Sequence, residues 1–222
     1  MSLPNGTAPD PAAFIRANTL IEAPPLVPEI RLHLASEITP IWQATEETLA
    51  QGQVPPPYWA FAWAGGQALA RYVLDRPETV AGRRVLDFGA GSGLIGVAAS
   101  RAGTAAVTAA DIDPFAAAAI ALNAALNGVG ITVESADLIG RPGDPWDVVL
   151  VGDMCYERPL AERLTAWLRR LAGAGATVLL GDPGRNYLPG SGLTELTRYT
   201  VPTSRELEDR DSRAGVVWRV EP

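Results

Sequence analysis

Short apolar runs alternate with segments of helical spacing along most of the chain. Apolar runs of strand length occupy residues 85–88, 106–110, 131–135, 146–151 and 176–180. The segments between them that have the composition or spacing of helices are 94–102, 115–126 and 160–171. In the last of these, apolar residues recur at positions 160, 164, 167, 168 and 171, as in a helix that packs one face on a sheet. Strands that alternate with helices predict an α/β protein with a doubly wound, mostly parallel sheet.

The C-terminal end of the chain continues the sheet. Residues 196–201 and 215–220 are predicted to form two last strands, which brings the expected number of strands to seven. The segment between them, 204–213, is rich in charged residues, and we expect it to be a solvated loop or hairpin. Residues 56–222 are therefore expected to form one domain without an internal linker.

The N-terminal end does not follow this alternation. Residues 1–55 are predicted to be an extension that packs on the core. Its expected elements are a helix at 10–20, a strand at 29–34 and a helix at 39–49. The single histidine, His33, has the polar phase of that strand and no partner carboxylate in the sequence. We expect it to face solvent and not to act as a general base.

The most informative stretch runs from Asp87 to Gly96 and reads Asp-Phe-Gly-Ala-Gly-Ser-Gly-Leu-Ile-Gly. Its glycines allow a tight turn from strand to helix and let a flat ligand approach the main chain, while the open N–H groups of the helix attract a hydrogen-bond acceptor. From Gly91 onward the stretch matches the G-x-G-x-x-G fingerprint of dinucleotide sites, with Asp111 20 residues later. From Asp87 onward it is an acid followed by three glycines at every second position. Both interpretations predict a nucleotide-like cofactor at this turn.

Aspartates at or just beyond the ends of four predicted strands help to decide between these interpretations. They are Asp87, Asp111, Asp137 and Asp153. Ligands of such sheets bind at the carboxyl ends of the strands, so these side chains are expected to surround the cofactor. Carboxylates repel a pyrophosphate and attract a cation, which favours a cationic cofactor over a dinucleotide. The chain also has no lysine, so it lacks a P-loop lysine and the Tyr-x-x-x-Lys pair that would assist hydride transfer.

Aromatic residues crowd the segment before a predicted helix at 67–74. Tyr58, Trp59, Phe61 and Trp63 follow a run of three prolines. We expect Trp63 to lie at the cofactor or substrate site, because an indole attracts an alkylammonium group by a cation–π interaction. The other three aromatic side chains are expected to fill the core at one end of the sheet.

Composition narrows the class of partner and the compartment. The 222 residues include 25 acidic and 18 basic side chains for a net charge of −7, which argues against nucleic acid as the principal partner. The sequence has no apolar run that predicts a membrane span and no signal-peptide pattern at its start, so we expect a cytoplasmic protein. No metal site is predicted. Cys155 is the single cysteine and has no adjacent histidine to activate it, so it is expected to point into the core.

Five stretches together resemble a known family. They are residues 57–69, 85–93, 111–114, 152–156 and 181–185. The combination is similar to the seven-β-strand lysine methyltransferases, and among them to the enzymes that modify the β-subunit of electron transfer flavoprotein. That family has an Asp/Glu-x-x-Tyr/Phe motif after its fourth strand, which Asp153 and Tyr156 match. The resemblance covers the chain from about residue 57 to the C-terminus, and each motif alone is common.

The resemblance implies a class I, Rossmann-like methyltransferase domain over residues 56–222 that uses S-adenosylmethionine and releases S-adenosylhomocysteine. The implied cofactor-binding residues are Trp63, Asp87, Gly89, Ala90, Gly91, Ser92, Gly93, Asp111, Ile112, Asp137, Leu138 and Gly152. Asp111 is expected to accept hydrogen bonds from the ribose hydroxyls, Ile112 to pack on the adenine, and Asp137 to accept from the adenine amino group.

Two residues are expected to border the methyl-transfer channel and to be catalytic. Asp153 is predicted to hold and orient the incoming lysine ammonium, whose proton leaves to water. Tyr156 is predicted to line the channel, and the alternative is that it is a core aromatic at a strand end. Most of the rate is expected to come from holding donor and acceptor in line in a dry channel.

The expected substrate is the β-subunit of electron transfer flavoprotein, and no nucleic acid or membrane partner is expected. Methyltransferases of ribosomal protein L11 share the Asp111-Ile-Asp-Pro114 stretch, so a ribosomal protein of the L11 or L7/L12 type is the nearest alternative substrate. A small-molecule amine is a further alternative. Outside the methyltransferases, an NAD(P)-binding oxidoreductase and a non-catalytic cofactor-binding regulator stay open.

Overall fold

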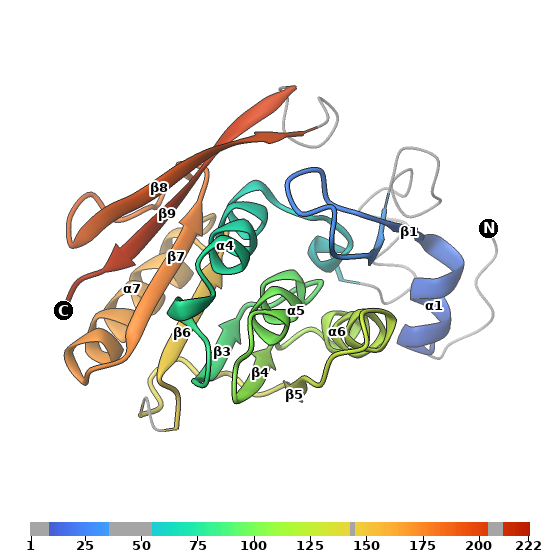
Figure 1. Ribbon diagram of the computed structural model, residues 1–222, viewed down its shortest axis with the longest axis horizontal. Coiled ribbons are helices and arrows are strands. Elements are labelled where there is room, and N and C mark those ends of the chain that lie inside the picture. Colours follow the sequence, from blue (N-terminus) through green and yellow to red (C-terminus); the bar gives the residue numbers. More distant parts are fainter. Residues whose placement is uncertain (1–8, 36–54, 143–144, 204–210) are drawn as a thin grey trace.

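The structure is a computed structural model that describes residues 9–35, 55–142, 145–203 and 211–222. A seven-stranded sheet lies at its centre, with the order β5-β4-β3-β6-β7-β9-β8 (Figure 1). Its strands are β3 (Arg84–Phe88), β4 (Ala106–Ala110), β5 (Thr132–Glu134), β6 (Val148–Gly152), β7 (Thr177–Asp182), β8 (Leu193–Pro202) and β9 (Ser212–Val220). Strands β5, β4, β3, β6 and β7 are parallel, whereas β9 is antiparallel to both β7 and β8. The predicted doubly wound, seven-stranded α/β fold is confirmed.

The central strands are apolar along their whole length because both faces of the sheet are covered. In β6 the four residues from Val148 to Val151 are all buried. The side chains of Val149 and Val151 belong to one core cluster, and those of Val148 and Leu150 belong to another. This alternation of faces explains why the buried parallel strands appear in the sequence as continuous apolar runs.

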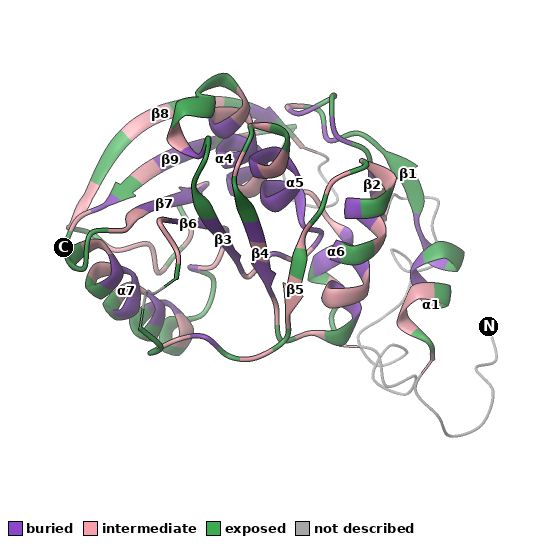
Figure 2. Ribbon diagram, turned by 60° about the horizontal axis from the view of Figure 1, so that its bottom comes forward, coloured by how far each residue is buried: buried purple, intermediate pink, exposed green. Residues whose placement is uncertain are grey.

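Helices cover both faces of the sheet (Figure 2). On one face lie α4 (Ala64–Asp75), α5 (Leu94–Arg101) and α6 (Pro114–Leu126), and on the other lies α7 (Arg158–Gly173). The start of α6 follows from its sequence, because the Asp113 side chain accepts a hydrogen bond from the Phe115 N–H and proline occupies the first helical position. None of the helices in the described ranges is both long and apolar enough to cross a membrane.

The described part of the N-terminal extension packs on α5 and α6. It contains α1 (Pro11–Asn18) and a two-stranded antiparallel sheet of β1 (Leu20–Glu22) and β2 (Leu32–Leu34). Ile15 of α1 packs against Phe115 of α6, and residues of β2 pack against α5. Strand β1 was not predicted. The helix predicted at 39–49 lies outside the described residues.

His33 is more enclosed than predicted. Its ring is half-buried, and Nδ1 lies 3.2 Å from the Thr19 hydroxyl next to β1. Its backbone N–H donates to the buried Asn123 side chain of α6 at 2.8 Å. The expectation of a solvent-facing side chain is wrong because the unpredicted strand β1 pairs beside it, and burial lowers the pKa of His33.

Two glycines bring α4 and β7 into backbone contact. A Cβ atom at Gly65 of α4 would collide with the Gly181 carbonyl oxygen, and one at Gly181 would collide with the carbonyl oxygen of Gly65. Neither glycine has a positive φ, so the requirement here is for space. This contact sets the beginning of α4 directly against the carboxyl end of β7.

We expect Gly181→Ala to lower the free energy of unfolding by about 3 kcal/mol, because backbone atoms on both sides must move to admit the methyl group. Guanidinium chloride unfolding measures the change. Gly190→Ala is the matched control, since a Cβ at Gly190 meets open space. Equal stability of the two variants would contradict the close approach of α4 and β7.

Candidate active site

A cavity of about 510 Å³ opens at the carboxyl ends of β3, β4, β5 and β6. This volume is within the usual range for small-molecule sites. Of the residues predicted from the sequence, those that line the cavity are Trp63, Gly89, Gly91, Asp111, Ile112, Asp137, Gly152, Asp153 and Tyr156. A small adjoining cavity of about 50 Å³ is lined by residues that include Ala90 and Ser92. The chain positions predicted for the site therefore mostly converge at one place.

Three of the predicted cofactor residues line neither cavity. Leu138 is buried in the core against α7, and its neighbour Ile139 lies on the cavity wall in its place. Gly93, with φ 77°, is the residue before α5 and packs over Ile120 of α6. Asp87 is the third, and its position has consequences for stability.

The Asp87 carboxyl group lies beneath the glycine loop, which is formed by residues 89–93 between β3 and α5. Asp87 is the last but one residue of β3, so strand alternation directs its side chain to the face that α5 covers. There Oδ2 accepts a hydrogen bond from the Gly96 N–H at 2.8 Å, whereas Oδ1 has no hydrogen-bond partner within the described part of the chain. Burial, with a smaller contribution from the charge of Asp111, raises the pKa of Asp87 to about 7.

Asp111 holds the glycine loop against the end of β4. Its Oδ2 accepts from the Gly91 N–H at 2.9 Å, and its Oδ1 accepts from the Asp113 N–H at 3.1 Å. Gly91 has φ 51°, a left-handed conformation that glycine adopts at little cost. Burial raises the pKa of Asp111, and the second lone pair of each oxygen remains available to a ligand hydroxyl.

Aromatic side chains form the outer wall of the cavity. Trp63, next to the start of α4, donates from Nε1 to the Tyr58 carbonyl oxygen at 2.9 Å. The Tyr58 ring lies 5.7 Å from the ring of Tyr156, centroid to centroid, and these side chains are 55% and 39% exposed. This exposed position favours the prediction that Tyr156 lines the methyl-transfer channel over the alternative that it is a core aromatic.

Only part of the aromatic segment fills the core. Trp59 is buried, as predicted, and it stacks on Phe115. The prediction that Tyr58 is a core residue is wrong, because the single turn of 3₁₀ helix at Tyr58–Ala60 directs successive side chains to different sides. Cys155 is buried as expected, and burial raises its pKa to about 12.

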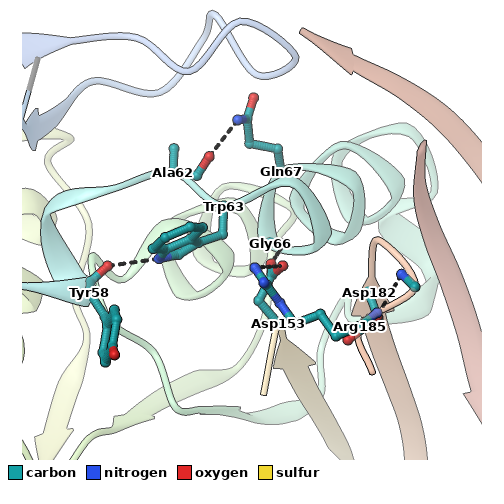
Figure 3. Close-up of polar contacts among 9 residues, drawn as sticks. Tyr58, Ala62, Trp63, Gly66, Gln67, Asp153, Asp182 and Arg185 are labelled. Atoms are coloured by element: carbon teal, nitrogen blue, oxygen red, sulfur yellow. Dashed lines mark hydrogen bonds and ion pairs between the residues drawn. The ribbon is translucent and has the colours of Figure 1, made fainter. Parts of the chain in front are cut away.

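The Asp153 carboxylate joins three elements at the inner end of the cavity (Figure 3). Its Oδ2 accepts from the Gly66 N–H of α4 at 2.6 Å, and its Oδ1 forms an ion pair with Arg185 Nη2 at 2.8 Å. Among the described residues, Asp153 is the one non-glycine residue with a positive φ, 58°. Asp153 is 7% exposed, and burial raises its pKa, opposed by the charge of Arg185 and by the N–H groups at the start of α4.

The sequence alone predicts no function for Arg185, although this residue ends the stretch 181–185 that supports the resemblance. Its guanidinium carbon lies 5.3 Å from the centre of the Trp63 ring. Tyr58 and Arg163 also line the cavity without having been predicted there. The available signal for Arg185 was its place just after a buried strand end, where side chains of such sheets reach the ligand.

Comparisons with known proteins agree with this geometry. Residues 67–152 match the family model described as ribosomal protein L11 methyltransferase. The electron transfer flavoprotein beta subunit lysine methyltransferase of Xenopus laevis is 40% identical over 96% of this chain and 87% of its own length. The protein of the same description from Danio rerio is 39% identical over 96% of this chain and 84% of its own length. The chain belongs to the electron transfer flavoprotein β-subunit lysine methyltransferase family.

A solved structure supports the fold of this family member. Magnesium protoporphyrin IX methyltransferase from Synechocystis PCC 6803 with bound S-adenosylmethionine superposes with a TM-score of 0.52 and 18% sequence identity. The match covers 71% of this chain and 80% of the other. At this identity the likeness concerns the class I Rossmann-like fold.

The side chains of the cavity fit S-adenosylmethionine, the methyl donor of this methyltransferase family. Asp111, Asp137 and Asp153 lie on its wall. Of these, Asp111 accepts only from backbone N–H groups in the hydrogen bonds that the structure shows, so its carboxylate can stabilise a cationic ligand and accept from ribose hydroxyls. The two arginines among the lining residues are each paired with an aspartate, Arg163 with Asp137 at 3.1 Å and Arg185 with Asp153. Because these cations are already neutralised, the wall does not suit a pyrophosphate, which argues against the dinucleotide alternative.

Asp87 makes stability depend on pH. Its pKa in the folded protein is about 7, above the ordinary value, so the folded state binds more protons than the unfolded state between about pH 4 and 7. Stability therefore falls as pH rises through this window. Asp87→Asn keeps an oxygen for the Gly96 N–H and does not titrate. We expect the fall in unfolding free energy from pH 5 to pH 7 to be about 2 kcal/mol smaller in this variant.

Urea unfolding at pH 5, 6, 7 and 8 measures this difference. Asp147→Asn serves as the control, because pairing with Arg84 lowers the pKa of the exposed Asp147 to about 2 and leaves it ionised throughout this range. Parallel stability curves for the wild type and Asp87→Asn would contradict the assignment.

Proposed function

We propose that this protein transfers methyl groups from S-adenosylmethionine to lysine ε-amines of the electron transfer flavoprotein β-subunit. The observation that supports this best is one cavity with carboxylates along its inner wall and two exposed tyrosines at its opening. The carboxylate of Asp111 suits a cationic methyl donor, and the aromatic opening suits a long alkylamine side chain. The names of the relatives supply the identity of the protein substrate.

The cofactor is proposed to lie along the ends of β3, β4 and β6. Asp111 would hold the ribose hydroxyls, the exposed Ile112 side chain would cover the adenine, and Gly152 would leave room for the amino-acid part. When bound, S-adenosylmethionine supplies a methyl group activated by the positive charge of its sulfur. Asp137 shares its carboxylate with Arg163 and with the Ile139 N–H, so a further acceptor contact to adenine would use its remaining lone pairs.

The reacting lysine is proposed to enter between Tyr58 and Tyr156 and to reach the region of Trp63 and Asp153. A free lysine has a pKa of about 10.4, so its ammonium must lose a proton to water before the nitrogen can act as a nucleophile. The aromatic rings would exclude water from the channel and restrict the direction of approach. Positioning of this kind is a large part of the rate of a two-substrate reaction.

Transfer of labelled methyl groups tests the proposal. The purified protein is incubated with labelled S-adenosylmethionine and, separately, with the electron transfer flavoprotein β-subunit, ribosomal protein L11, ribosomal protein L7/L12 and nicotinamide. We expect label in the flavoprotein subunit, on lysines that mass spectrometry identifies. Preferential labelling of L11 or L7/L12 would contradict the proposed substrate, and tight binding of NADH without transfer would contradict the activity.

Asp153→Asn is expected to lower kcat for this transfer about 100-fold, because the ion pair that orients the inner end of the channel is lost. Asparagine tolerates the left-handed backbone at this position, so the loop conformation is retained. The exposed pair of Arg198 with Glu195 offers a control, and Glu195→Gln should transfer at the wild-type rate. A fully active Asp153→Asn protein would remove Asp153 from the site.

Asp111→Asn is expected to weaken S-adenosylhomocysteine binding about tenfold or more, because one amide oxygen replaces two charged acceptors. Isothermal titration calorimetry measures the dissociation constant. Glu195→Gln is again the control. An unchanged dissociation constant in Asp111→Asn would show that the cofactor does not contact the end of β4.

A further inference from the structure

Both groups that the sequence suggested for an incoming ammonium already contact an internal cation. The guanidinium of Arg185 pairs with the Asp153 carboxylate at 2.8 Å and lies over the Trp63 ring at 5.3 Å (Figure 3). A carboxylate and an aromatic face are the two features that bind an alkylammonium group. Because both features are already occupied by a guanidinium, the arrangement determines whether the channel binds the substrate lysine as an ammonium or as a neutral amine.

Arg185 is held in this position from its own loop. The buried Asp182 carboxyl group accepts from the N–H groups of Gly184 and Arg185, both at 2.7 Å. The Arg185 side chain is 18% exposed. Because the backbone on one side and the ion pair on the other both constrain it, the guanidinium is part of the wall of the cavity.

Asp153 is constrained as well. Its carboxylate accepts from the Gly66 N–H, and its own N–H donates to the Gly181 carbonyl oxygen at 2.9 Å. The pair of Asp153 and Arg185 therefore contributes opposite charges at nearly the same place on the wall. Their fields largely cancel for a third group, so the wall offers little net attraction to an ammonium.

We propose that Arg185 is a positioning residue that fixes Asp153 and Trp63 and, by neutralising the carboxylate, makes the channel admit the lysine side chain as its neutral amine. The proposal deepens the proposed function and rests on it. The buried ion pair then favours the reactive state of the substrate, since only the neutral amine has the lone pair that forms the new bond.

In the proposed reaction the neutral amine is the nucleophile. The lysine ammonium gives one proton to water as it enters, and the amine nitrogen forms a bond to the methyl carbon while the carbon–sulfur bond breaks. The positive charge passes from sulfur to nitrogen, so the product is a methylated ammonium. The neutralised pair of Asp153 and Arg185 offers this new cation little net attraction, so it does not hold the product in the channel.

The titratable neighbours of the pair leave a clear window for a pH experiment. Burial raises the pKa of Asp182 to about 6 and that of Cys155 to about 12, and it also raises the pKa of Tyr156. Arginine stays protonated throughout. Asp87, with a pKa of about 7, is ionised above pH 8, so between pH 8 and 9.5 the rate reports the protonation of the substrate lysine.

Arg185→Met tests the proposal because it leaves the carboxylate free to stabilise an ammonium. We expect the midpoint of the kcat–pH profile to move up by about one unit, with kcat at pH 7.5 about tenfold lower. The double variant Asp153→Asn with Arg185→Met has no charge at either position, and its midpoint should return to the wild-type value. Arg185→Lys keeps the charge and should keep the midpoint.

Arg163→Met is the matched control, since Arg163 is the other arginine that lines the cavity and pairs with Asp137. Its midpoint should not move. Thermal unfolding and S-adenosylhomocysteine binding are measured for each variant to show that the fold and the cofactor site persist. A lower kcat in Arg185→Met with an unmoved midpoint would overturn the proposal in favour of a purely structural ion pair.

A binding measurement provides a second test that needs no turnover. Calorimetry with n-butylammonium, on protein saturated with S-adenosylhomocysteine, measures how well the channel holds a lysine-like cation at pH 7.5. We expect about tenfold tighter binding by Arg185→Met than by the wild type. Equal binding would overturn the inference, whereas absence of methyl transfer by the wild type would contradict only the proposed substrate and activity.

Discussion

The hydrogen bond from the start of α4 to the Asp153 carboxylate is the interaction on which the site depends. The first N–H groups of a helix have no partner within the helix and carry a partial positive charge, so a buried carboxylate is stabilised there. The contact joins α4 to the end of β6, and the backbone approach of Gly65 and Gly181 joins the same turn to β7. Trp63, which precedes α4, is thereby placed over Arg185.

The charges of the cavity follow from this arrangement. Asp153 and Asp137 are each paired with an arginine, whereas Asp111 accepts only from backbone N–H groups in the hydrogen bonds that the structure shows. One end of the cavity thus presents an anionic acceptor, and the other presents a neutralised pair below an aromatic opening. A cationic donor and a neutral nucleophile are the two reactants that such a division of charge favours.

The N-terminal extension is coupled to the glycine loop through one buried side chain. Asn123 of α6 donates to the Ser92 carbonyl oxygen at 2.8 Å and accepts from the His33 N–H. Because Asn123 is fully buried, both of these contacts offset the cost of removing its amide from water. The described part of the extension therefore stabilises the same loop, residues 89–93, that Asp111 also contacts.

The sequence by itself determined the order of strands and helices along the chain and the glycine turn after β3. Most of the site residues predicted from it line the cavity, because strand ends of a parallel sheet meet at one edge. It also determined the family, through motifs that act in combination. Only the tertiary structure decided that Asp87 lies beneath the loop, that Tyr58 opens to solvent and that Arg185 faces Asp153. The direction of the Asp87 side chain depends on where alternation along β3 places it, and that of Tyr58 depends on a single turn of 3₁₀ helix. The contact of Arg185 with Asp153 joins residues 32 apart in the chain, so it forms only when the elements pack.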